Sequence, residues 1–135
     1  MNIRLVKLSD EYKRHLIEMM DEWTATGEKI VPSAIRRNDY HDFEYYLEHL
    51  DRKEEVDGKV PHDVFFCLDI DRDIFVGAIN LRHYCTEEML IHAGHIGDGI
   101  RPSERRKGYA TEMIGLALKE AKKLGIDRVL MCCDK

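Results

Sequence analysis

Hydrophobic and polar residues follow two periods along the chain, and the first half is mainly helical. Residues 2–7 alternate as in a half-buried strand. From Ser9 onward, apolar side chains recur every three or four positions, which is the spacing of an amphipathic helix capped by that serine or the next residue. Residues 28–37 then form a predicted loop. A second amphipathic pattern, which Asn38 can cap, runs out in the charged stretch 51–55.

Strand-like patterns replace the helical ones after Pro61. Residues 64–70 and 74–84 are rich in β-branched and aromatic side chains, and the three charged residues 71–73 between them predict a hairpin turn. A further strand and turn are expected at 94–100, a stretch that contains three glycines.

One long amphipathic helix is predicted over residues 110–124, with Gly125 as its C-terminal cap. Residues 128–133 are apolar and form the last predicted strand. A strand, a helix and a strand in this order make a crossover, which places the two strands nearly parallel in one sheet. The order of elements therefore predicts a mixed α/β sheet with helices packed on it, in a single domain over residues 1–135.

Composition narrows the classes of function. Of the 135 residues, 44% are hydrophobic and 35% are charged, which fits one globular domain with a real core. The net charge of −5 argues against a dedicated nucleic-acid binder. No long apolar run and no signal peptide is found, so we expect a cytoplasmic protein without a membrane partner. The four cysteines show no CxxC spacing, and we expect structural thiols and no metal.

The start of the predicted helix at 110–124 is unusual, because three cations stand where the helix dipole favours acids. Arg105, Arg106 and Lys107 are followed at once by Gly108, a poor helix former. A cationic turn with a glycine before a helix favours an anion, since the first helical N–H groups have no partner within the helix. The two common phosphate-binding motifs, GxxxxGK[ST] and GxGxxG, are absent. The alternative interpretation is a solvated basic turn that binds nothing.

The stretch from residue 100 to 111 resembles the acetyl-CoA motif of the GNAT superfamily of N-acetyltransferases. In that motif an apolar residue, a Gln or Arg, a Gly, and a Gly or Ala occupy fixed positions, here filled by Ile100, Arg105, Gly108 and Ala110. The order of elements also matches the first three-quarters of that fold, and the chain is similar to small bacterial members. The resemblance implies an α/β fold of the α+β type: a twisted, mostly antiparallel mixed sheet with helices on both faces.

The same resemblance implies a cosubstrate and a reaction. Acetyl-CoA would donate an acetyl group to a primary amine of a small molecule or peptide, which attacks the thioester directly in a ternary complex. Backbone N–H groups after residue 104 would hold the CoA pyrophosphate, cationic side chains would assist at its edge, and the main chain at 99–100 would pair with the pantetheine arm. One backbone N–H there would polarise the thioester carbonyl. The residues implied for the cosubstrate are Gly99, Ile100, Arg105, Arg106, Lys107, Gly108, Tyr109, Ala110 and Thr111.

A general base is needed, because an alkyl amine is mostly protonated at neutral pH. His95 and Asp98 lie on the predicted strand at 94–100 and are the candidates, directly or through water. Alternation places them on opposite faces of the strand, so at most one faces a given site. Their ordinary interpretations are a buried, hydrogen-bonded histidine and a polar strand residue. The loop after Gly27 is expected to line the acceptor pocket.

The resemblance covers the family pattern only up to its fifth strand. The family continues with an Asn-containing loop, a helix and a further strand, which often supply a tyrosine acid, and no tyrosine follows Tyr109 here. The apolar strand at 129–133 is then an exposed edge, which we expect to pair with a second copy of the chain as a homodimer. A shortened, catalytically weak CoA-binding remnant, or a fragment, is the alternative. An interaction domain using the basic turn is disfavoured by the net charge.

Overall fold

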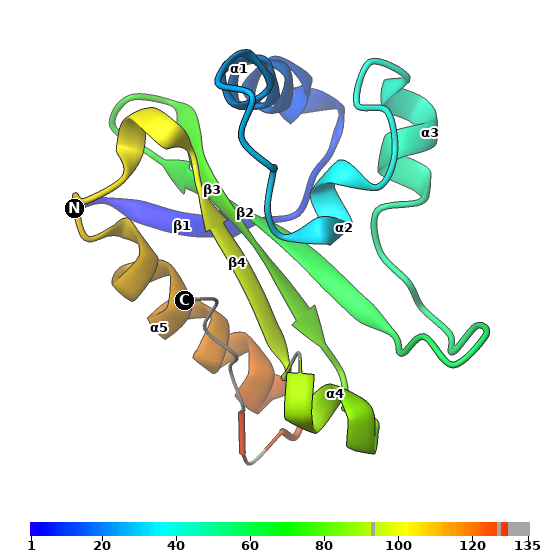
Figure 1. Cartoon of the computed structure of the whole chain (residues 1–135). Helices are drawn as coiled ribbons and strands as arrows, with labels where there is room; N and C mark the ends of the chain where they lie inside the picture. The colour runs from blue at the N-terminus through cyan, green and yellow to red at the C-terminus, as the bar shows by residue number, and fades with distance from the viewer. Residues whose placement is uncertain (93, 127, 130–135) are drawn as a thin grey trace.

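A single antiparallel sheet forms the centre of the computed structural model, which describes residues 1–92, 94–126 and 128–129, with side chains at 90–92 excepted (Figure 1). Its strands are ordered β1-β2-β3-β4, and each pairs antiparallel with its neighbour. The predicted parallel strand at 128–133 lies mostly outside the described residues, so the crossover and the dimer edge stay predictions. The strands are β1 (Ile3–Val6), β2 (His62–Asp69), β3 (Ile74–Arg82) and β4 (Ile96–Ile100).

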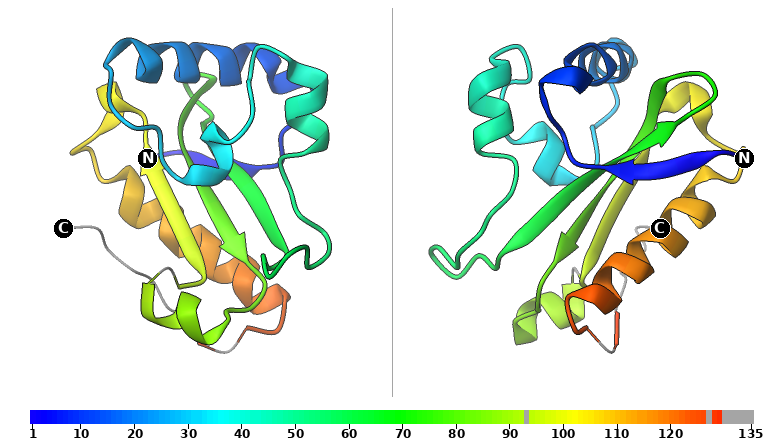
Figure 2. Two further views of the ribbon diagram at one scale, coloured as in Figure 1. Left: turned by 45° about the vertical axis from the view of Figure 1, so that its right-hand side comes forward. Right: turned by 180° about the vertical axis from the view of Figure 1, so that it is seen from behind.

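Helices cover both faces of this sheet, as the sequence predicts (Figures 1 and 2). One face carries the short helix η1 and α1–α3, and the other carries α5, while α4 connects β3 to β4. The helices are η1 (Asp10–Tyr12), α1 (Lys13–Ala25), α2 (Ser33–Arg36), α3 (Phe43–Glu48), α4 (Glu87–His92), η2 (Pro102–Glu104) and α5 (Tyr109–Lys123).

Strand alternation divides the core into two clusters. Side chains on one face of β2 and β3, such as Phe66 and Phe75, pack with Trp23 and other buried apolar residues of α1. Side chains on the other face, such as Ile79, pack against α5, where Met113 and two alanines are buried. A register shift at Cys67/Leu68 places Phe75 and Ile79 on opposite faces. Small residues let the helix lie close to the sheet.

The structure differs from the predicted pattern in its short helices and at one helix surface. The predicted loop at 28–37 contains α2, and α3 is capped by the side chain of Asp42, which accepts a hydrogen bond from the Tyr45 N–H, rather than by Asn38. Helix α4 has six residues, and its apolar residues 89–91 are consecutive, so no helical period shows. Leu118 and Leu124 continue the apolar stripe of α5 but are 44% and 46% exposed among the described residues.

Candidate functional site

The four residues 105–108, between η2 and α5, form a loop that we call the anion loop. Two of them have a left-handed backbone: Arg106 with φ 64° and Gly108 with φ 89°. Gly108 is the N-cap of α5, and a side chain there would carry the steric cost of this conformation. The space beside it is open, since an added Cβ would meet only the Met1 Cε at 3.7 Å. Glycine is therefore needed for the turn itself, and the turn leaves the main chain accessible.

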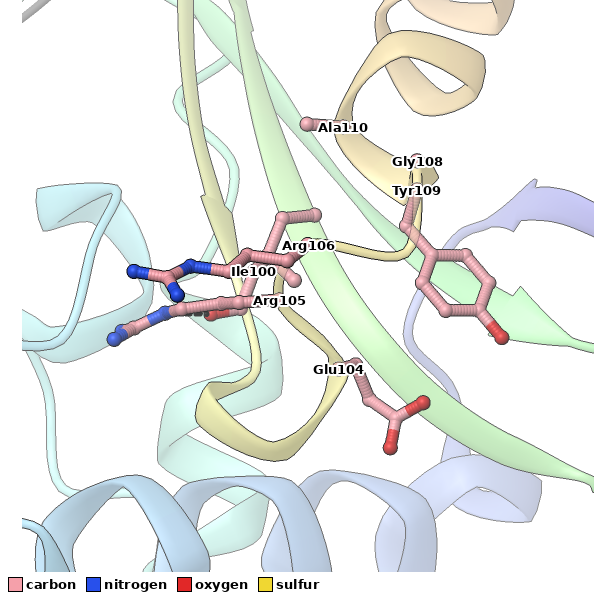
Figure 3. A pocket seen from close by; sticks show the side chains of 7 residues that line it. All are labelled: Ile100, Glu104, Arg105, Arg106, Gly108, Tyr109 and Ala110. Atoms are coloured by element: carbon pink, nitrogen blue, oxygen red, sulfur yellow. Dashed lines mark hydrogen bonds between the residues drawn. The ribbon is translucent and has the colours of Figure 1, made fainter.

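A pocket of about 390 Å³ opens at this loop, at the start of α5. In Figure 3 the side chains of Arg105 and Arg106 point to one side of the loop, and those of Glu104 and Tyr109 to the other. The structure thus brings most of the predicted cosubstrate residues together, whereas Gly99, Lys107 and Thr111 do not line this pocket. The lining residues are Ile100, Glu104, Arg105, Arg106, Gly108, Tyr109 and Ala110.

The cations of the anion loop differ in how they are engaged. Arg105 donates to the Glu28 carboxylate at 2.9 and 3.1 Å, and its guanidinium lies 5.9 Å from the ring centre of Trp23. Lys107 pairs with Glu104 at 3.4 Å. Within the described residues, the exposed Arg106 side chain makes neither a hydrogen bond nor an ion pair. It is therefore the cation most available to a ligand.

The chain that enters the anion loop is held against α1 by Glu22. This carboxylate accepts hydrogen bonds from Arg101 Nε at 2.9 Å and from the Ser103 N–H at 3.0 Å, and a third comes from the Ser103 hydroxyl. Burial raises the pKa of Glu22, but the hydrogen bonds from Ser103 and Arg101 outweigh burial and the net pKa is lowered. An ionised Glu22 thus joins α1 to the end of β4.

The segment before α2 crosses closely over β4. A Cβ on Gly99 would lie 2.6 Å from the Val31 carbonyl carbon and closer still to its oxygen, and a Cβ on Gly97 would lie 3.3 Å from Pro32. These two glycines therefore let the predicted acceptor loop rest on the strand. On its other edge, β4 has no strand partner within the described part of the chain.

The two candidate bases are both partly desolvated. Asp98 pairs with Ile79 in the register and shares its face with Ile96 and Ile100, on the α5 side. Burial raises the pKa of Asp98. His95 precedes β4 and is buried, and alternation places it on the opposite face, that of Gly97. Burial, and then the charge of Arg82, lowers its pKa.

The family comparison agrees with this geometry. The family model of the Acetyltransferase (GNAT) domain matches residues 2–135. The chain belongs to the GNAT acetyltransferases. No curated protein matches the sequence significantly.

Two kinds of feature are absent from the described part of this acetyltransferase. None of the helices in that part is both long and apolar enough to cross a membrane. The described His, Cys, Asp and Glu side chains form no group of three or more that could hold a metal ion.

Several acidic residues around the anion loop are absent from the sequence-based prediction. Glu22 and Glu28 come from α1 and the segment after it, and Glu104 is 4% exposed beside the pocket. Asp69, from the end of β2, holds the Tyr109 hydroxyl at 2.7 Å. Only Glu104 carries a local signal, since it directly precedes the cations; the others are distant in sequence.

Proposed function

We propose that this acetyltransferase takes its acetyl group from acetyl-CoA and transfers it to the nitrogen of a primary amine on a small molecule or peptide. The anion loop is the observation that carries the proposal. Its left-handed turn, its Arg106 and the first residues of α5 line one pocket of about 390 Å³. The first N–H groups of a helix have no partner within the helix and favour an anion. These features suit a pyrophosphate, the most highly charged part of CoA near its pantetheine arm.

The residues present fit this cosubstrate in two further respects. The edge of β4 away from β3 offers main-chain groups of Ile100, which an extended amide chain such as pantetheine can pair with. The main chain of Gly99, predicted for the same role, is turned toward Ala78 on β3 by the alternation that the Arg82–His95 and Arg101–Val76 hydrogen bonds set. A bound thioester supplies an activated acyl group, and a β4 N–H supplies a donor for its carbonyl oxygen. Arg105 and Lys107, already paired with carboxylates, contribute charge at the rim of the site.

The acceptor amine approaches, in this proposal, from the face of β4 covered by Val31 and Pro32. His95 is the base on that face, and its lowered pKa keeps the imidazole neutral and able to accept a proton near pH 7. Asp98 is the base if the amine arrives from the α5 side; its raised pKa makes the carboxylate a better proton acceptor. His95→Gln and Asp98→Asn distinguish the two, because only loss of the base shifts the pH profile of kcat.

The proposal is tested by two measurements on the full chain. Free thiol released from acetyl-CoA is followed over a panel of small amines and peptides, beside a calorimetric titration with CoA. Binding with amine-dependent thiol release is expected. Binding without release by any amine supports a CoA-binding remnant instead, and no binding contradicts both. Gly108→Val should weaken CoA binding about tenfold or more, because valine cannot adopt the left-handed turn without strain.

A further inference from the structure

The turn between β2 and β3 contacts both ends of the anion loop through one side chain. Arg72 donates from its Nη2 to Glu104 Oε1, at the end of η2, and to the Tyr109 hydroxyl at 2.8 Å, at the start of α5. Its Nε donates to Asp69 Oδ2 at 3.0 Å. One planar guanidinium therefore ties the residue before the loop and the residue after it to the same strand end.

The partners of Arg72 are themselves buried. Glu104, Asp69 and Tyr109 are 4%, 7% and 7% exposed, and the Tyr109 hydroxyl donates to Asp69 Oδ2. The hydrogen bond from Arg72 lowers the pKa of Glu104, and contact with Glu104 in turn raises the pKa of Arg72. A carboxylate this deeply buried needs such a partner to stay ionised.

Glu104 also lines the pocket in which we place the pyrophosphate. A negative charge on this wall repels a phosphate unless a cation neutralises it. Lys107 reaches Glu104 only at 3.4 Å and is half exposed, whereas Arg72 bonds it directly. The principal cation that neutralises Glu104 is thus contributed from outside the motif, more than thirty residues earlier in the chain.

We propose that Arg72 is a positioning residue for the anion loop, which holds the spacing between Glu104 and Tyr109 and neutralises the buried Glu104 carboxylate beside the phosphate site. This inference rests on the proposed function, because it takes the CoA pyrophosphate as the ligand of the loop. Arg72 itself does not line the pocket, so it acts through Glu104 and Tyr109.

The experiment measures CoA affinity by calorimetry in the wild type, Arg72→Met, Arg72→Lys and the double variant Arg72→Met/Glu104→Gln. A charged hydrogen bond corresponds to roughly ten- to hundredfold in an equilibrium constant, and we expect Arg72→Met to weaken CoA binding by that much. Arg72→Lys keeps the positive charge but loses the forked N–H donors of the guanidinium. Its CoA affinity should therefore lie between those of the wild type and Arg72→Met. Removing the Glu104 charge in the double variant should restore most of the loss.

Arg14→Met is the matched control. Arg14 also reaches this turn, through Asp73 at 3.1 Å, but contacts α1 and not the anion loop. It should leave CoA affinity within about twofold of the wild type, at the precision with which such constants are compared. Thermal melts of all variants confirm that each is folded at the titration temperature. If Arg72→Met is unfolded at that temperature, the CoA affinity of Arg72→Lys tests the inference in its place.

The outcomes separate this inference from the proposed function. If the wild type binds CoA and Arg72→Met or Arg72→Lys binds it equally well, the inference is wrong and the proposed function stands. If Arg14→Met weakens binding as much, or Glu104→Gln restores nothing, Arg72 only stabilises the turn and the inference is again wrong. If the wild type does not bind CoA, the proposed function itself fails.

Discussion

The two ends of β4 are built in different ways. Beyond Ile100, charged groups hold the chain: Glu22 binds Arg101 and Ser103, and Arg72 binds Glu104. At the other end, the strand is held by main-chain contact with a neighbouring segment and by buried side chains that carry no charge. There Gly97 lies under Pro32, with the buried Asn80 on β3 and His62 on β2 nearby, and the contact with the segment before α2 continues along β4 to Gly99.

This difference indicates how each end responds to change. The charged end, which we assign to the donor, depends on the Glu22 carboxylate contributed by α1 and on the Arg72 guanidinium contributed by the β2–β3 turn. The other end, together with the face of β4 under the segment before α2, is what we assign to the acceptor, and it depends on the absence of side-chain atoms at Gly97 and Gly99. Substitutions that add side-chain atoms should therefore destabilise the acceptor end most. Substitutions that remove a charge should instead weaken the structure and the CoA affinity of the donor end.

The largest effect is expected for Gly99→Ala. The new Cβ would overlap main-chain atoms of Val31, which no side-chain rotation can relieve, so we expect a loss of about 3 kcal/mol or more in the free energy of unfolding. Urea denaturation measures it. Gly115→Ala is the control, since nothing lies within 4 Å of that helical glycine; it should stabilise by up to about 1 kcal/mol. Equal midpoints for wild type and Gly99→Ala would refute the close crossing.

The two ends should also lose stability in different pH ranges. Burial, followed by the charges of Arg37 and Arg52, lowers the pKa of His62 to about 4. An unfolded histidine titrates near 6.5, so between these values the unfolded state binds more protons. Stability is therefore full above about pH 6.5 and falls as the pH drops to about 4, by roughly 3 kcal/mol in total.

Denaturation of wild type and His62→Gln from pH 7.5 to 4 measures this contribution. The difference in unfolding free energy between them should change across that range, with the wild type showing the steeper loss. Glu104 has a lowered pKa, because Arg72 and other groups favour its charged form. The stability that ionised Glu104 contributes is fully present above the pKa of an unfolded glutamate and is lost only as the pH falls further. Glu104→Gln should therefore show the same pH dependence of the unfolding free energy as the wild type between pH 7.5 and 5. A parallel pH dependence for all three proteins would contradict the distinction between the ends.

The smallest effect is expected for Glu28→Gln. The Glu28–Arg105 pair links the acceptor segment to the anion loop, but its side chains are 49% and 40% exposed. Such pairs contribute at most about 1 kcal/mol, so the melting temperature should change little. Because Arg105 loses its carboxylate partner, CoA affinity should rise slightly, by about fivefold at most, the equivalent of that energy. A clear loss of CoA affinity would show that Glu28 positions Arg105 instead of competing for it.

Much of the fold follows from patterns within single segments. The periods of α1, α5, β2 and β3 are long enough to show, and helices on both faces of the sheet are confirmed. The short helices α2 and α4 are missed, because their apolar residues, 34–35 and 89–91, are consecutive and show no helical period. Residues 130–135 lie outside the described part, so the last predicted strand stays a prediction.

The residues of the candidate site likewise divide into those that a local sequence pattern predicts and those that only the fold brings together. The motif from Ile100 to Ala110 is contiguous, so its composition alone pointed to an anion. Glu22 and Arg72 look like ordinary solvated charges in the sequence; their roles depend on which elements the fold brings beside the loop. Likewise, nothing near Gly99 in the sequence shows that Val31 crosses it, since the two are far apart along the chain.

The central claim is that the donor end binds a pyrophosphate, and paired calorimetric titrations of the wild type with CoA and with pantetheine test it most directly. Pantetheine retains the arm that would pair with β4 but lacks the phosphates that would contact Arg106 and the start of α5. The account predicts measurable binding of CoA and binding of pantetheine weaker by at least about a hundredfold, the equivalent of one or two charged hydrogen bonds. Equal affinity for the two ligands, or no binding of CoA, would contradict it.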